Sequence, residues 1–202
     1  MFTFDDFFKR YPQLTVCQQD ILSAYELMRN TFANGNKLLL CGNGGSASDC
    51  SHISGELLKS FKKKRPVPTE FRNIVGNDVA DNLQGALPAI SLPEMVGINT
   101  AYCNDCDPQY NFAQLVYGLG RPNDALLAIS TSGNSKNVNL AATVAKAKKI
   151  TVIGLTGQSG GMLCAKCDVC IKVPECETFK VQELHLPVYH ALCLMLENEL
   201  FK

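Results

Sequence analysis

Two turns rich in glycine and serine each stand between an apolar run and a helical pattern. GNGGS (42–46) follows KLLLC, and STSGNS (130–135) follows DALLAIS. Glycines let a backbone approach a ligand with its N–H groups turned inward, a helix N-terminus adds partial positive charge, and hydroxyls supply further donors. Either turn alone fits a simple turn with an N-cap, but two in equivalent places favour a phosphate monoester. The candidate phosphate ligands are Asn43, Gly44, Gly45, Ser46, Ser130, Thr131, Ser132 and Ser135.

Other glycine-rich phosphate loops do not fit this chain. Neither turn contains the Gly-Lys-Ser/Thr of a nucleoside-triphosphate loop. The dinucleotide fingerprint needs a third glycine and an acidic residue about 20 positions further on, where this chain has lysines.

An imidazole and a carboxylate follow the first turn. His52 and Glu56 stand at i and i+4, on one face of a helix that begins at the turn. By helix rise the pair lies about 10 Å from the turn, within reach of the far end of a sugar phosphate. The alternative is a surface hydrogen bond. In the last helical stretch, spacing alone pairs Gln182 with His185 and leaves His190 two turns away.

Five apolar runs and five amphipathic stretches alternate along the chain. The predicted strands are 37–41, 86–92, 124–130, 150–156 and 168–173, and the predicted helices are 13–34, 47–61, 107–118, 135–148 and 180–201. Continuous apolar runs indicate parallel strands covered on both faces. We therefore expect an α/β fold: a doubly wound, parallel, five-stranded sheet flanked by helices, a flavodoxin-like three-layer sandwich. Both polar turns then lie beyond the carboxyl ends of strands, where such sheets bind ligands.

The predicted organisation is a single domain over 1–202, with N-terminal helices in 1–34 and an insertion at about 64–85. Phe4, Phe7, Phe8 and Tyr11 share one helical face, which indicates packing on this domain or on a neighbouring subunit. Residues 64–85 are too polar for a core strand and too long for an ordinary connection, so we expect an excursion with its own short helix.

Composition excludes several classes of partner. The formal net charge is zero, which gives no electrostatic reason to expect nucleic acid or an anionic membrane surface. The basic run KKKR (62–65) fits a solvated helix end. No signal peptide and no membrane-spanning run are recognisable, so a cytoplasmic protein is expected.

The ten cysteines are therefore expected to be reduced thiols. Cys103 and Cys106 form one cluster, and Cys164, Cys167 and Cys170 form another. Because Cys170 falls inside a predicted strand, the second cluster does not have the single short loop of an iron–sulfur or structural zinc site.

Four segments together resemble the sugar isomerase (SIS) domain family and, within it, the phosphoheptose isomerases: CGNGGSASDCSHISGEL, ISTSGNSKNV, VIGLTGQSGG and VQELHLPVYH. The resemblance implies interconversion of sedoheptulose 7-phosphate and D-glycero-D-manno-heptose 7-phosphate by metal-assisted proton transfer through an enediol. It also implies a homotetramer.

The resemblance further implies roles for individual residues. Glu56 would be the base and His190 the acid, and one zinc ion per subunit would be held by His52, Glu56, Gln182 and His190. Gln182 would also contact substrate, as would Asn104 and Asp105. The stretch VGND (75–78) looks similar to the family's Asn-Asp motif but precedes the second strand, so we assign the motif to 104–105 on chain order.

Two departures and one rival reading accompany the resemblance. The segment between Glu56 and the second strand is longer than the family pattern. PECETFK (174–180) lacks the acidic–basic pair expected before Gln182, so either Glu177 or Thr178 would take over a sugar contact, and the sequence does not choose between them. The rival is a non-catalytic SIS-domain scaffold resembling the replication-initiator-associating protein, or a phosphosugar-binding regulator. The presence of Glu56 and His190 favours the enzyme.

Overall fold

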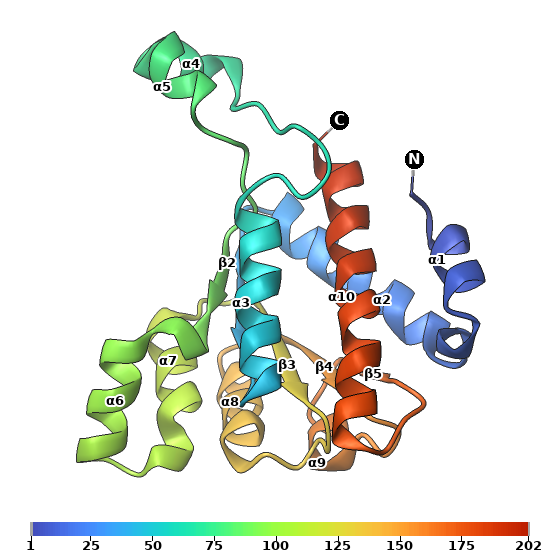
Figure 1. Ribbon diagram of the computed structural model, residues 1–202. Coiled ribbons are helices and arrows are strands. Elements are labelled where there is room, and N and C mark those ends of the chain that lie inside the picture. The colour runs from blue at the N-terminus through green and yellow to red at the C-terminus, as the bar shows by residue number, and fades with distance from the viewer. Residues whose placement is uncertain (1, 202) are drawn as a thin grey trace.

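Five parallel strands form one sheet in the order β2-β1-β3-β4-β5 in the computed structural model (Figure 1). The strands are β1 (Leu38–Cys41), β2 (Ala89–Ser91), β3 (Ala125–Ser130), β4 (Thr151–Thr156) and β5 (Val169–Lys172). The structure describes residues 2–201, so Met1 and Lys202, the ends of the predicted domain, lie outside it. Every predicted strand is present, although β2 is shorter than expected, and the predicted fold class is confirmed.

Helices cover both faces of the sheet, and two more project away from it. The helices are α1 (Phe4–Arg10), α2 (Gln18–Ala33), α3 (Gly45–Leu58), α4 (Thr69–Val75), α5 (Asn77–Asp81), α6 (Val96–Asp105), α7 (Asn111–Leu119), α8 (Lys136–Ala147), α9 (Gly161–Cys164) and α10 (Thr178–Leu200). Short 3₁₀ turns occupy Pro12–Cys17, Leu92–Glu94 and Pro108–Tyr110.

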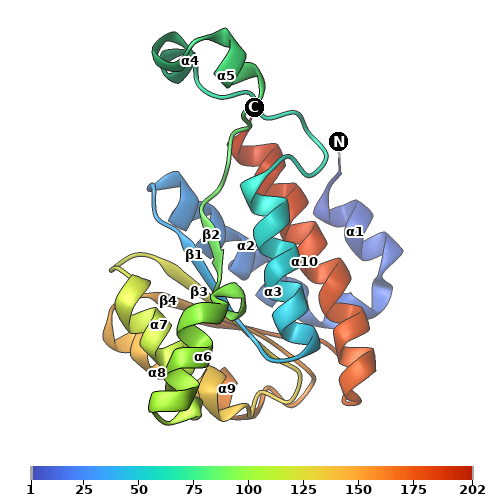
Figure 2. The ribbon, with the colours of Figure 1, turned by 60° about the vertical axis from the view of Figure 1, so that its left-hand side comes forward.

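The side chains of the strands divide the core in two. Leu38 and Leu40 point to the face covered by α1, α2, α3 and α10, and Leu39 and Cys41 point to the face covered by α7 and α8 (Figures 1 and 2). All four are fully buried. This burial on both faces explains why the strands read as unbroken apolar runs.

The aromatic N-terminal helix packs on its own domain. Phe7 and Phe8 are buried in the core beside α10, while Phe4 meets the ring of Tyr25 edge-on at 5.4 Å between centroids. Of the two expectations for this helix, the structure supports packing within the chain.

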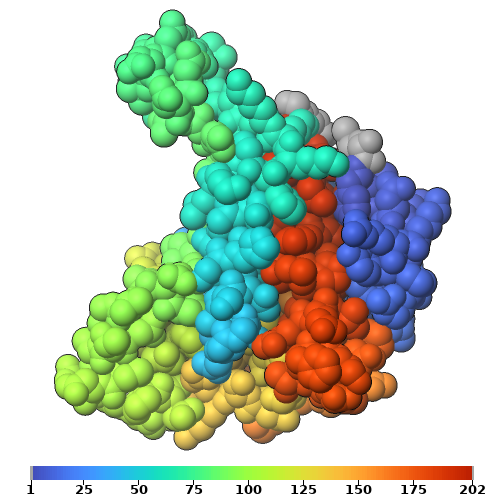
Figure 3. All heavy atoms as spheres, viewed as in Figure 1, coloured from blue at the N-terminus to red at the C-terminus, as the bar shows by residue number. Residues whose placement is uncertain are grey.

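The segment expected to contain one short helix contains two, α4 and α5, which project from the body as an arm (Figures 1 and 3). Its base is closed by two hydrogen bonds, from Gly85 N–H to Arg65 O at 2.7 Å and from Ser60 N–H to Gln84 Oε1 at 2.8 Å. The arm leaves the domain at the C-terminal end of α3.

The expectation of a solvated basic helix end is wrong for Arg65, which is fully buried. Its Nε lies 2.8 Å from Glu197 Oε1 on α10, and its other nitrogens donate to the carbonyl oxygens of Leu57 and Glu56. The last carbonyls of a helix have no partner within it, so Arg65 satisfies those of α3 as well as the buried carboxylate. This pair binds the base of the arm to both α3 and α10.

Helix α6 was not predicted from the sequence. None of its residues is buried, so it lacks the apolar stripe from which an amphipathic helix is recognised. Within residues 2–201 no helix has the length and apolar character needed to span a membrane.

Candidate active site

The two polar turns meet in one cavity of about 330 Å³ at the carboxyl ends of β1 and β3. It is lined by Asn43, Gly44, Gly45, Ser46, Ile129, Ser130, Thr131, Ser135, Thr178 and Gln182. The structure thus brings together both predicted phosphate loops and Gln182, which lies near the start of α10. Thr178, one of the two alternatives for a sugar contact, lines the cavity, and Glu177 does not. Ser132 was predicted but does not line the cavity, and its Oγ accepts a hydrogen bond from Asn134 N–H at 3.2 Å.

The first loop needs its glycines for two different reasons. Gly44 has φ 56°, a conformation that side chains with a Cβ rarely adopt. A Cβ on Gly45 would overlap Nε2 of Gln182, so the absence of a side chain allows α10 to approach the start of α3. Ser46 is almost fully buried at the base of the turn.

The second loop is held by its own hydroxyls and by the turn after β4. Ser130 Oγ and Ser135 Oγ lie 3.0 Å apart. Gly133 has φ 68° and packs directly on the carbonyl of Gly160, where a Cβ would clash. The hydroxyls and N–H groups of both loops therefore surround one small space, as binding of a phosphate group requires.

A second group of polar residues lies further along α3 and α10, which run side by side (Figures 1 and 3). His52 Nε2 is 3.3 Å from Glu56 Oε1, and the His190 ring centroid is 5.0 Å from that of His52. The structure therefore brings together the predicted base, the predicted acid and the neighbouring imidazole.

Tyr189 fixes the orientation of the His52 ring. Its hydroxyl donates to Asp49 Oδ1 at 3.2 Å and lies 3.0 Å from His52 Nδ1. Because the phenol proton is given to Asp49, its oxygen accepts from Nδ1–H, which leaves Nε2 without a proton in the neutral ring. A bare Nε2 facing a carboxylate 3.3 Å away is unfavourable unless a proton or another cation lies there.

Glu56 and His190 have unsatisfied buried atoms. Within residues 2–201, Glu56 Oε2 and His190 Nε2 have no hydrogen-bond partner, although the Lys59 ammonium lies 3.8 Å from Glu56 Oε2. Burial lowers the pKa of His190, the nearby His52 lowers it further, and Glu56 opposes both effects. A neutral imidazole and a free carboxylate oxygen are suited to moving protons.

The donor set suits zinc in its chemistry. Two imidazoles and a carboxylate are ordinary zinc ligands, and the bare Nε2 of His52 and the unsatisfied atoms of Glu56 and His190 are atoms that a cation would satisfy. As the side chains stand, the described residues contain no group of three or more His, Cys, Asp or Glu close enough to hold a metal ion. Gln182, the fourth ligand implied by the family resemblance, precedes His190 by about 12 Å of helix rise and lines the phosphate cavity.

The remaining predicted residues lie apart from both groups. Asn104 and Asp105 are exposed at the end of α6, where their side chains share a 2.8 Å hydrogen bond. VGND (75–78) lies at the junction of α4 and α5 in the arm, at the other end of α3 from the phosphate cavity (Figure 1).

His185 is fully buried in the core. Burial lowers its pKa to about 4, the nearby backbone of Thr156 opposes this only in part, and within the described chain neither ring nitrogen completes a hydrogen bond. Its surroundings are those of a helix-packing residue.

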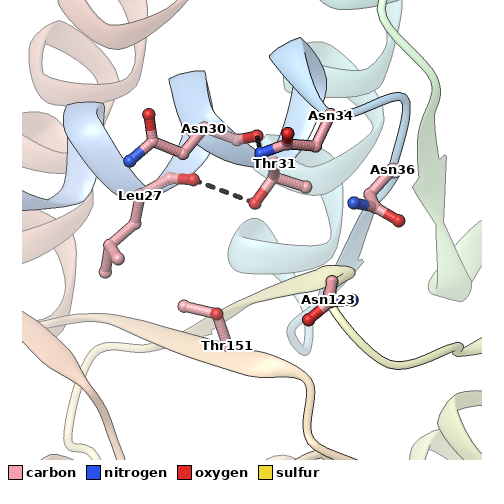
Figure 4. Close-up of a pocket in the computed structure, with 7 residues that line it drawn as sticks. All are labelled: Leu27, Asn30, Thr31, Asn34, Asn36, Asn123 and Thr151. Atoms are coloured by element: carbon pink, nitrogen blue, oxygen red, sulfur yellow. Dashed lines mark hydrogen bonds between the residues drawn. The ribbon is translucent and has the colours of Figure 1, made fainter.

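A larger cavity of about 470 Å³ lies at the other end of the strands, beside their amino ends (Figure 4). Leu27, Asn30, Thr31, Asn34, Asn36, Asn123 and Thr151 line it. The last three lie at or before the amino ends of β1, β3 and β4, whereas ligands of such sheets bind at the carboxyl ends. It contains none of the predicted site residues.

The cysteines are free thiols. Cys164 ends α9, Cys167 lies in the following turn and Cys170 lies in β5. The sulfurs of Cys167 and Cys170 approach Gly154, where a Cβ would lie 2.7 and 3.1 Å from them.

The sequence and the fold were compared with those of known proteins. Residues 100–195 match the SIS domain family. Over 209 aligned positions the chain is 35% identical to the phosphoheptose isomerase of Aneurinibacillus thermoaerophilus, and the alignment covers 98% of this chain and 96% of that protein. The chain belongs to the phosphoheptose isomerase family of SIS-domain proteins. The predicted family is confirmed.

Other members of the phosphoheptose isomerase family support the same assignment. The chain is 41% identical to the protein of Trichlorobacter lovleyi over 176 positions, 87% of this chain and 80% of that protein. The solved phosphoheptose isomerase of Neisseria gonorrhoeae superposes with a TM-score of 0.77 at 32% identity, covering 96% of this chain and 95% of that one. The Aneurinibacillus and Neisseria matches cover 98% and 96% of this chain, so they extend well beyond the SIS match and include the first polar loop.

Proposed function

We propose that the protein interconverts sedoheptulose 7-phosphate and D-glycero-D-manno-heptose 7-phosphate. This aldose–ketose isomerisation follows from its family. The observation that carries the proposal is the placement of the cavity between the two phosphate loops at the start of α3 and α10, with His52, Glu56 and His190 further along the same two helices. The phosphate and the reacting carbons of one extended sugar would occupy these two positions.

The proton transfers are assigned to Glu56 and His190. In the open-chain ketose, Glu56 takes a proton from C1 while His190 gives one to O2, which produces the enediol. The proton on O1 then returns to His190, and Glu56 returns its proton to C2, so the aldose forms with no net change in atoms or charge. Oε2 of Glu56, which has no hydrogen-bond partner among the described residues, is the atom available for the carbon proton, and His190 gives and regains the oxygen proton at the ring nitrogen that does not bind the metal.

Zinc is proposed as the cofactor, with His52, Glu56, Gln182 and His190 as its ligands, the set that the family resemblance implies. When bound, the metal would polarise the carbonyl oxygen and stabilise negative charge on the enediol oxygens. Gln182 also lines the phosphate cavity, so it is proposed to contact the substrate as well. A homotetramer and a cytoplasmic location also remain proposals.

The test is proton exchange into the product. Zinc-loaded protein is incubated with sedoheptulose 7-phosphate in heavy water and followed by NMR. We expect aldoheptose 7-phosphate with deuterium at C2. Glu56→Gln and His190→Ala should each lower turnover by about 10²–10⁴-fold while retaining the circular dichroism spectrum of the parent.

The matched control is Glu183→Gln, which makes the same chemical change on an exposed side chain of α10. It should keep full turnover. Near-normal rates in either active-site variant would refute the assigned roles. No turnover of any sugar phosphate by the parent would refute the function and favour the scaffold.

A further inference from the structure

Asn137, in the first turn of α8, joins the two phosphate loops. Its side chain exchanges two hydrogen bonds with that of Asn43: Asn43 Nδ2 donates to Asn137 Oδ1, and Asn137 Nδ2 donates to Asn43 Oδ1, both at 2.9 Å. Asn43 belongs to the first loop, and Asn137 lies two residues after the end of the second. The amide of Asn43, predicted to contact substrate, is thus paired with another side chain.

The orientation of this amide pair is determined by the backbone. Asn137 Oδ1 also accepts the Val138 N–H at 3.0 Å. Because a backbone N–H can only donate, the atom facing it must be the amide oxygen, which places Nδ2 towards Asn43. The Asn43 amide must then present its oxygen to Nδ2 and its nitrogen to Oδ1. One backbone group therefore fixes both side chains.

Two further asparagines extend the contact. Asn137 Nδ2 lies 3.4 Å from Asn111 Oδ1, and Asn111 Nδ2 donates to Asn99 Oδ1 at 3.1 Å. Asn99 in turn donates to the Leu92 carbonyl at 2.9 Å. This asparagine chain (Asn43, Asn137, Asn111 and Asn99) links the first loop to α8, α7 and α6. Asn137 is held from two sides and is not free to follow a displaced loop.

The cavity depends on the spacing of the two loops. Asn43, Gly44 and Gly45 form one wall, and Ser130, Thr131 and Ser135 form the other. A phosphate group can accept from both walls at once only if the spacing is held before it binds, because ordering a loop on binding reduces affinity.

We propose that Asn137 is a positioning residue that fixes the first phosphate loop against the second by pairing with Asn43. The inference rests on the proposed function, because it concerns the phosphate subsite of that same site. It assigns Asn137 no contact with the reacting carbons.

The test combines direct phosphate binding with steady-state kinetics. Inorganic phosphate is titrated calorimetrically into the zinc-loaded protein, and kcat and KM are measured for sedoheptulose 7-phosphate. Asn137→Ala should weaken phosphate binding and raise KM by about tenfold each, with kcat within about threefold, since the lost hydrogen bonds hold only the phosphate end.

Three further variants make the result specific. Asn43→Ala should have a similar effect, and the double variant Asn43→Ala/Asn137→Ala should be no worse than the poorer single variant, because each alanine removes the same pair. Asn137→Ser keeps an acceptor in the first turn of α8 but cannot reach Asn43, so it should behave like the alanine variant. Asn82→Ala, in the arm, should match the parent.

The outcomes separate the two proposals. Parent-like phosphate binding by Asn137→Ala, or effects of the two single variants that multiply in the double variant, would overturn the positioning role. A parent that binds phosphate without turning over the heptose phosphate would refute the proposed function, while the binding data would still decide the role of Asn137. A parent that does not bind phosphate would refute both.

Discussion

The Tyr189 hydroxyl lies 3.0 Å from Nδ1 of His52, so a residue of α10 sets the orientation of an imidazole on α3. The same hydroxyl donates to Asp49, which fixes the direction of the His52 contact. A partner on the second ring nitrogen typically holds a metal-binding histidine in one tautomer and strengthens its affinity for metal.

Tyr189→Phe should therefore weaken zinc binding by about 10- to 100-fold, because His52 loses the contact that orients it. The measurement is competition with a chelator, followed by activity at saturating zinc. Tyr117→Phe, an exposed tyrosine, is the control. An unchanged zinc affinity for Tyr189→Phe would remove His52 from the proposed ligand set.

Gly45→Ala should raise KM by about tenfold, because the new Cβ displaces the amide of Gln182 from the phosphate cavity. Gly55→Ala, in the same helix, has nothing within 4 Å of the added atom. It should leave KM unchanged and raise the free energy of unfolding by about 0.5–1 kcal/mol. Equal KM values for the two variants would contradict the placement of Gln182.

Removing one partner of the buried pair of Arg65 and Glu197 should destabilise the fold strongly, because the other charge would remain buried. Arg65→Met and Glu197→Leu should each lower the free energy of unfolding by about 3–5 kcal/mol, since each leaves a buried charge unpaired. The double variant should cost less than the sum of the two. Chemical denaturation measures all three.

An exposed ion pair gives the control for that experiment. Arg72 and Asp81 lie 2.7 Å apart in the arm, and Arg72→Met should change the unfolding free energy by at most about 1 kcal/mol. If Arg65→Met were equally mild, the Arg65 side chain would not be buried in solution.

His185 should make the free energy of unfolding depend on pH in the acid range. Its pKa falls from 6.5 to about 4 on folding, because burial disfavours the charged ring. Between these values the unfolded chain binds a proton that the folded chain does not, so the free energy of unfolding decreases as the pH falls through this window. The full effect is about 3 kcal/mol.

Replacing His185 by glutamine should flatten the pH dependence of unfolding between pH 6.5 and 4. Every other ionisable group is the same in the two proteins and cancels in the comparison. Parallel stability curves for the parent and His185→Gln would contradict the buried, uncharged state of this ring.

The strands and most helices could be predicted because burial on both faces of a parallel sheet leaves unbroken apolar runs. Helix α6 could not, since it buries none of its residues. Arg65 was misread because a basic run gives no sign of which of its members meets a buried carboxylate 132 positions away.

The candidate site, too, could be predicted only in part. The two polar loops and the His52–Glu56 spacing are local patterns, and the structure brings them together. Asn137 pairs with a residue 94 positions away, and no local spacing reports such a contact. The separation of Gln182 from His190 follows from helix rise alone, but only the packing of α10 on α3 reveals that Gln182 stands beside Gly45.

The closed base of the arm has an evolutionary consequence. The chain leaves the body at Arg65 and returns at Gly85, and one hydrogen bond of 2.7 Å already joins these two residues. A segment of almost any length can be inserted between two points that are in contact without repacking the sheet. Residues 66–84 are therefore a place where relatives of this protein can differ in length, and where a designer can shorten, exchange or add sequence, while the catalytic helices keep their positions.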